Sequence, residues 1–129
     1  MTDSLTDNAV RNDLTEGGAL IASDRVEGTT VYNRQGEKLG HISNFMVDKR
    51  SGQVRYAVLS FGGFLGMGND HYPLPWSMLE YDTGKGGYVV ELDKAVLDNA
   101  PRYEAQSRPD YDERYGRSVY DYYGVTYPW

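Results

Sequence analysis

The sequence predicts an all-β fold: a small antiparallel β-barrel of about six strands, with a short helix after the last strand and a helical extension at the C-terminal end. Short runs of β-branched and aromatic residues recur along the middle of the chain, separated by turn signals rich in glycine, asparagine and aspartate. The length of 129 residues leaves room for one domain of this size. We therefore expect one compact β domain spanning residues 20–103.

The N-terminal part of this domain predicts a hairpin. Residues 1–19 are polar and without periodicity, so we expect a disordered tail before it. Residues 29–32 favour a strand, and residues 33–36 supply turn chemistry. The apolar positions between residues 39 and 47 change phase once at a period of two, which predicts a β-bulge near Ser43 and Asn44.

Further strands follow along the chain. The turn at residues 48–52 closes a second hairpin onto a strand at 53–61. Pro73 and Pro75 remove two amide donors from one side of the next strand, which indicates an edge strand or a barrel seam. After a turn at 83–87 and a strand at 87–92, Asp93 is expected to cap a short helix at residues 94–99.

Residues 104–129 form an aromatic extension, and seven of the twelve tyrosines lie between Tyr103 and Tyr127. Asp110 and Glu113 have the spacing of a capping box, and Gly124 is suited to end the helix that follows. The aromatic face of this helix consists of Tyr111, Tyr115, Val119 and Tyr122. Gly116 weakens the helix, so the helix needs a docking surface. We favour its own barrel over a partner as that surface.

Composition and charge exclude several classes of protein. The net charge is −6 and concentrates in the two ends of the chain, which argues against direct binding of nucleic acid. The absence of cysteine excludes disulfides and thiolate zinc sites. No stretch approaches the roughly 20 apolar residues of a transmembrane helix, so we expect no transmembrane segment and a cytoplasmic location.

The glycine-rich stretch at residues 60–76 does not match a catalytic or phosphate-binding motif. Its glycines fit neither G-x-x-x-x-G-K-[ST] nor G-x-G-x-x-G, and residues 56–84 contain no lysine or arginine. Asp70, His71 and Asp82 lack the regular spacing of metal ligands. Ser60 and His71 lack the surroundings of a catalytic serine. We therefore predict no catalytic residue, no metal and no cofactor.

Seven large side chains are instead candidates for an interaction surface. Three of them stand between the glycines of the 60–76 stretch, and four belong to the extension. They are Phe64, Leu65, Met67, Tyr111, Tyr115, Tyr122 and Trp129. Exposed groups of this kind mark sites of protein association.

The sequence also resembles a known family. The matching segments are VYNRQGEKLG (31–40), VDKRSGQVRYAVL (47–59), GGFLGMG (62–68), PWSML (75–79) and VVELDKAVLDNAP (89–101). Together they are similar to the PRC-barrel domain, which is shared by the H subunit of photosynthetic reaction centres and the ribosome maturation factor RimM. The resemblance implies a barrel that serves as an interaction module and brings no family-wide active site.

The functional prediction is a non-enzymatic interaction or assembly module that self-associates, with a dimer as the favoured homo-oligomer. Because the family includes a ribosome factor, one alternative is an accessory of RNA metabolism that binds a ribosomal protein. Two further alternatives are a factor associated with a photosynthetic complex and a small enzyme. The chain is similar to stand-alone bacterial PRC-barrel proteins.

Overall fold

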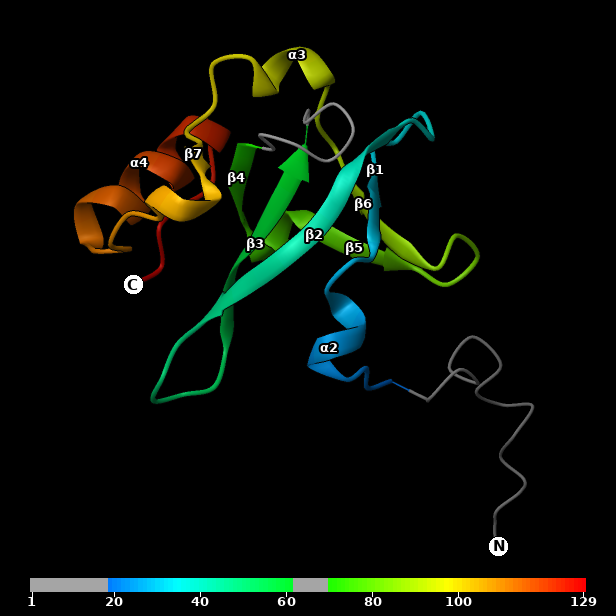
Figure 1. Ribbon diagram of the computed structural model, residues 1–129, viewed down its shortest axis with the longest axis horizontal. Coiled ribbons are helices and arrows are strands. Elements are labelled where there is room, and N and C mark those ends of the chain that lie inside the picture. The colour runs from blue at the N-terminus through cyan, green and yellow to red at the C-terminus, as the bar shows by residue number, and fades with distance from the viewer. Residues whose placement is uncertain (1–18, 62–69) are drawn as a thin grey trace, which may run out of the picture.

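The computed structural model describes residues 19–61 and 70–129, and the strands of this part form one strongly coiled sheet (Figure 1). The sheet has seven strands in the order β5-β6-β1-β2-β3-β4-β7. Their bounds are β1 (Thr30–Tyr32), β2 (Lys38–Val47), β3 (Val54–Phe61), β4 (Asp70–Pro75), β5 (Leu79–Asp82), β6 (Gly87–Val90) and β7 (Tyr103–Glu104). Neighbouring strands are antiparallel except for β1 and β6, which are parallel.

Three short helices and two 3-10 turns complete the described part. They are α2 (Ser23–Val26), η3 (Trp76–Met78), α3 (Lys94–Leu97), η4 (Ala105–Ser107) and α4 (Glu113–Tyr123). The helix expected at residues 94–99 is thus present but shorter. Asp93 stands at its N-cap position without a side-chain hydrogen bond, so the expected cap is not formed. The single turn of α2 was not predicted.

The predicted β fold is confirmed, but the strands of the described part do not close into the predicted barrel. Seven strands form instead of about six, and β1 pairs with β6 in parallel. No pairing among the described residues joins the edge strands β5 and β7, so the sheet does not close. Pro73 and Pro75 explain the open seam, because the side of β4 that lacks their amide donors cannot form a ladder with β5. Only Asp70 and His71 of β4 pair outward, with β7.

Local turn chemistry behaves as the sequence predicts. In the first turn Asn33 Oδ1 accepts hydrogen bonds from the backbone N–H groups of Gln35 and Glu37, and Gly36 adopts a φ of 87°. The β2–β3 register shifts between Ile42 and Asn44, which confirms the β-bulge. Both hairpins therefore form where the local signals place them.

The main core lies between the two halves of the coiled sheet. Val31, Ile42, Leu59 and Leu74 are fully buried there, together with the α3 residue Leu97. Each large aliphatic side chain buried in this way contributes roughly 1.5–3 kcal/mol. The core therefore holds the coiled sheet together across a seam that backbone hydrogen bonds do not close.

Candidate interaction surface

The C-terminal helix α4 packs against β4 on the side of the sheet opposite the β5–β6 hairpin (Figure 1). Its N-cap is Asp112, whose Oδ1 accepts a hydrogen bond from the backbone N–H of Tyr115 at 2.9 Å. The predicted capping box on Asp110 is therefore wrong by two residues. Gly124 ends the helix in the left-handed conformation with φ 70°, as predicted.

Gly116 is the point of closest approach between α4 and the sheet. A Cβ atom at this position would lie 2.4 Å from the hydroxyl of Tyr56 and 2.9 Å from Cε1 of Tyr127. A glycine that looks unfavourable for a helix therefore has a packing role. It lets the helix axis come close enough to bury Val119 and Tyr120 completely.

A second core of aromatic rings forms between the helix and β3. Tyr56 of β3 makes edge contacts with the rings of Tyr111 and Tyr120, at centroid distances of 5.0 and 5.5 Å. The hydroxyl of Tyr120 donates a hydrogen bond of 2.9 Å to the carbonyl of Arg55, and the hydroxyls of Tyr103 and Tyr111 are 2.6 Å apart. The extension thus docks on the sheet of its own chain, as we favoured.

Residues after the helix continue this packing. Tyr127 and Trp129 both contact the ring of Tyr120 edge-on, at 5.5 and 5.8 Å. Arg55 lies over the Trp129 ring, with Cζ 4.1 Å from its centroid, and its Nη2 is 2.5 Å from Oδ2 of Asp48. The last residue is therefore tied to the β2–β3 hairpin.

Burial keeps the tyrosines of this second core in their neutral form. It raises the pKa of Tyr115 and Tyr120 to about 12, in the case of Tyr120 against the opposing effect of nearby Arg55. Burial also raises the pKa of Tyr56, Tyr111 and Tyr123. At neutral pH these hydroxyls therefore stay protonated. Those of Tyr111 and Tyr120 form hydrogen bonds, whereas those of Tyr115 and Tyr123 are buried without a hydrogen-bond partner among the described residues.

The seven candidate interaction residues divide into three groups. Phe64, Leu65 and Met67 lie outside the described residues. Tyr111 and Tyr115 are half-buried against the chain's own sheet. Tyr122 and Trp129 remain 36% and 39% exposed, and the Tyr122 hydroxyl donates a hydrogen bond to the carbonyl of Val96. Among the described candidates, Tyr122 and Trp129 therefore offer the most surface to a partner.

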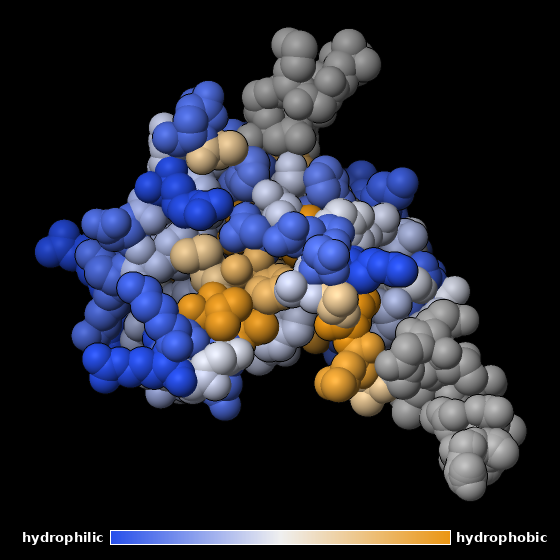
Figure 2. All heavy atoms as spheres, turned by 60° about the horizontal axis from the view of Figure 1, so that its bottom comes forward, coloured by the Kyte–Doolittle hydropathy of each residue, from blue (hydrophilic) through white to orange (hydrophobic). Residues whose placement is uncertain are grey.

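Sequence reasoning missed other exposed apolar side chains. Leu20 is 83% exposed, and Ile21, Val47, Tyr81 and Val96 are also exposed. Hydrophobic side chains gather in a band across the face seen in Figure 2, the side on which α2 and the β2–β3 hairpin lie in Figure 1. Among these, only the adjacent apolar pair Leu20 and Ile21 could have been recognised from the sequence. Strand alternation assigns a residue such as Val47 or Tyr81 to one face of the sheet but does not show what covers that face.

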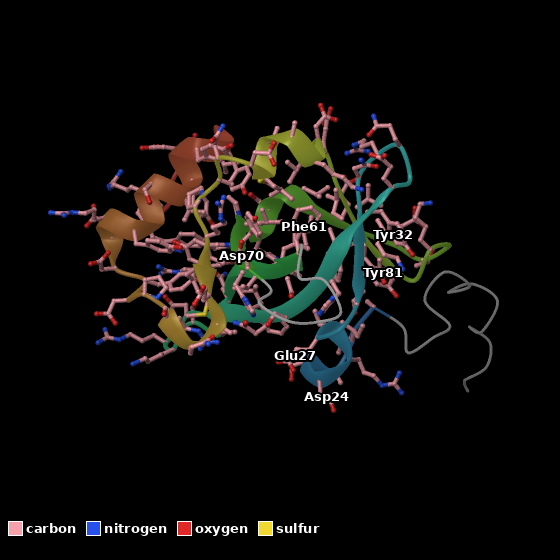
Figure 3. The ribbon with its side chains drawn as sticks, turned by 45° about the horizontal axis from the view of Figure 1, so that its top comes forward. Asp24, Glu27, Tyr32, Phe61, Asp70 and Tyr81 are labelled. Carbon is pink, nitrogen blue, oxygen red and sulfur yellow. The ribbon has the colours of Figure 1, made fainter. Side chains whose placement is uncertain are left out.

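The histidine considered for catalysis contacts a different hydroxyl from the one expected. His71 Nε2 lies 3.1 Å from Ser43 Oγ, whereas the previously considered Ser60 is a buried residue of β3. His71 Nδ1 has no hydrogen-bond partner among the described residues, so no carboxylate orients the ring there. Phe61 and Asp70 mark the chain positions on either side of residues 62–69 (Figure 3). The described residues contain no group of three metal-ligating side chains.

The β5–β6 hairpin presents a polar surface away from α4. An open hollow of about 390 Å³ lies beside it, lined by Asn33, Arg34, Glu80, Tyr81, Asp82, Thr83, Lys85 and Val89. Arg34 reaches Glu80 at 3.5 Å and Glu91 at 3.8 Å, and Lys85 Nζ lies 5.2 Å from the centroid of the Tyr32 ring. Tyr32 and Tyr81 lie on this side of the molecule, far from the extension (Figure 3).

These features define a class: a small, open β-barrel that carries exposed apolar groups and, in its described part, no assembled catalytic centre. The chain belongs to the PRC-barrel domain family, whose model matches residues 20–97. This match agrees with the resemblance drawn from the sequence. None of the curated proteins matches the chain.

A solved structure with similarity to the chain is a putative 16S ribosomal RNA processing protein RimM from Pseudomonas aeruginosa. The two share 17% identity with a TM-score of 0.39, over 62% of this chain and 48% of that protein. The chain therefore spans about half the length of that relative. No helix in the described part of this chain is long and apolar enough to cross a membrane.

Proposed function

We propose that the protein is a non-enzymatic protein-interaction or assembly module that self-associates, with a dimer as the favoured form. The observation that carries the proposal is the set of large apolar side chains left exposed on the described surface, above all Leu20, Tyr122 and Trp129. Water-exposed groups of this size favour association. Burying one of them contributes roughly 1.5–3 kcal/mol before the entropic cost of association.

The proposal predicts a mass that rises with protein concentration. Light scattering coupled to size-exclusion chromatography measures it on the full chain. We expect Leu20→Ser with Ile21→Ser to shift the equilibrium toward monomer, and the same pair of changes at Phe64 and Leu65 provides an independent test of the glycine-rich stretch. A monomer mass at the highest soluble concentration would exclude self-association.

A control variant separates an interface effect from a general loss of solubility. Lys94→Ser removes a long exposed side chain from α3 without removing an exposed apolar group. It should leave the association constant unchanged. If it weakens association as much as the double variants do, the apolar groups are not what drives it.

A second candidate function is an accessory of RNA metabolism that binds a basic ribosomal protein. The net charge of −6 and the membership of the PRC-barrel family support it. It predicts co-sedimentation with ribosomal subunits at low salt, with the bound fraction falling steeply as salt screens the charges. No co-sedimentation at low salt would eliminate this candidate.

An enzymatic role would depend on His71, the histidine that contacts Ser43. The non-enzymatic proposal predicts that a substrate screen finds no activity that His71→Ala removes. Turnover that is present in the unmodified protein and lost in this variant would contradict it.

A further inference from the structure

The outer edge of β5 is an unpaired strand edge. Within residues 19–61 and 70–129, β5 pairs only with β6, which leaves the backbone N–H and C=O groups of its other edge without a strand partner. The two other candidate edges are protected: β4 carries Pro73 and Pro75, and β7 is only two residues long. Prolines and very short strands are common means of preventing edge pairing. The chain uses neither of them at β5.

The two faces of β5 differ in chemistry. Successive side chains of a strand point to opposite faces, so Glu80 and Asp82 share one face while Leu79 and Tyr81 share the other. Leu79 packs against the main core. Tyr81 makes an edge contact with Tyr88 at 5.1 Å and is still 47% exposed. An added strand would therefore meet carboxylates on one face and an apolar, aromatic surface on the other.

The charge around this edge is acidic. Residues 79–93 contain Glu80, Asp82, Glu91 and Asp93, against Lys85 alone. Arg34 already faces the carboxylates of Glu80 and Glu91, while the Lys85 ammonium lies over the Tyr32 ring. Because both cations have local partners and the carboxylates outnumber them, the edge attracts a positively charged occupant.

A second copy of β5 is a poor occupant for the same reason. Two antiparallel copies that keep their faces aligned place residues of the same face opposite each other, so Glu80 meets Glu80 or Asp82. Like charges directly opposite each other on a sheet are destabilising. The carboxylates therefore act against self-pairing at this edge, which separates it from the surface proposed for the homodimer.

We propose that the β5 edge binds an extended basic segment of another protein by strand addition, with lysine or arginine side chains toward Glu80 and Asp82 and apolar side chains toward Leu79 and Tyr81. Backbone hydrogen bonds to β5 provide the affinity, and the alternation of basic and apolar residues provides the specificity. The inference rests on the proposed function as an interaction module and names the chemistry of one of its partners.

The test uses the full-length protein and a short capped peptide that alternates lysine and valine, labelled for fluorescence anisotropy. A matched peptide with glutamate in place of lysine controls for charge. A third peptide, methylated on its backbone nitrogens, controls for strand pairing. We expect only the first peptide to bind, and its amides and those of residues 79–82 to gain protection from hydrogen exchange.

Charge reversal at the edge is the matched test in the protein. Glu80→Lys should weaken binding of the lysine–valine peptide by roughly five- to tenfold, since one attraction is replaced by a repulsion. Glu104→Lys makes the same change on β7 at the opposite edge of the sheet and should have no effect. An unchanged NMR spectrum away from the substituted residue confirms that each variant is folded.

The outcomes separate this inference from the proposed function. Binding that survives backbone methylation, or that weakens equally in both variants, would reduce the interaction to nonspecific charge attraction and overturn strand addition. No binding by a protein that still self-associates would overturn this inference alone. Binding at β5 by a strictly monomeric protein would retain the interaction module and reject only its self-association.

Discussion

Replacing Gly116 by alanine should destabilise the protein, although the same change stabilises an ordinary helix. In an exposed helix the substitution gains about 1 kcal/mol, because alanine loses less backbone entropy on folding than glycine does. Here the added Cβ would stand 2.4 Å from the Tyr56 hydroxyl. The ring of Tyr56 cannot move aside easily, because Tyr111 and Tyr120 contact it at 5.0 and 5.5 Å.

The magnitude follows from the balance of these two effects. Overpacking of a filled core costs about 1–3 kcal/mol. A Cβ atom only 2.4 Å from the Tyr56 hydroxyl places this substitution in the upper part of that range, above the roughly 1 kcal/mol of helix propensity that alanine gains. We expect a net loss of about 1–2 kcal/mol in the free energy of unfolding, which lowers Tm by about 5 °C in a domain of this size. Urea unfolding followed by far-UV circular dichroism measures the difference.

A double-mutant cycle identifies the cause. Tyr56→Phe removes the hydroxyl nearest to the added methyl group, so the loss caused by Gly116→Ala should be smaller in the Tyr56→Phe background. Only part of the loss should be recovered, because Tyr127 Cε1 also lies within 2.9 Å. A Gly116→Ala variant as stable as the unmodified protein would refute the close approach of α4 to the sheet.

Three further predictions concern the extension and the sheet. Asp112→Ala should cost about 1 kcal/mol of stability by removing the N-cap, while Asp110→Ala should leave stability unchanged; equal losses in urea unfolding would contradict the capping assignment. Gly40→Ala should cost about 3 kcal/mol or more and lower the yield of folded protein in a solubility assay, because its Cβ would lie 2.2 Å from the backbone carbonyl oxygen of Ser60. The free energy of unfolding should fall as the pH rises from about 10 to 12. In the folded protein burial raises the pKa of Tyr120 to about 12, whereas in the unfolded chain its pKa is the ordinary 10.0, so in this range the unfolded state loses the proton and the folded state keeps it. Tyr120→Phe should reduce this fall by about 1.4 kcal/mol per pH unit, as measured by urea unfolding across the pH range, and an unchanged slope would contradict the burial of that hydroxyl.

Features set by neighbouring residues could be predicted from the sequence. The first turn depends on Asn33 and Gly36, which act within a few residues of each other, and the bulge near Ser43 appears in the apolar pattern of its own strand. Gly124 ends its helix through its own backbone freedom. In each case the physical cause and its result lie in the same short segment.

Features that depend on distant contacts could not be predicted. Asp110 and Asp112 both suit an N-cap, and the aromatic contacts of Tyr111 with Tyr56 and Tyr103 accompany the use of the later one. Nothing near Gly116 in the sequence indicates that Tyr56, sixty residues earlier, requires it.

The candidate site illustrates the same limit. The sequence identified large aromatic residues, but the distribution of exposure among them depends on how the helix is rotated on the sheet. Tyr115 therefore points toward the sheet while Tyr122 stays more accessible. The acidic β5 edge also escaped prediction, because strand order decides which strand lacks a neighbour.

The proline-bearing side of β4 has a mechanical consequence. Since no backbone ladder joins β4 to β5 in the described part of the chain, the two halves of the coiled sheet are connected at that side by the turn η3 and by side-chain packing. Parting them exposes apolar surface but breaks no interstrand hydrogen bond there. A fully closed cylinder would have to break a ladder of backbone hydrogen bonds to open at the same place.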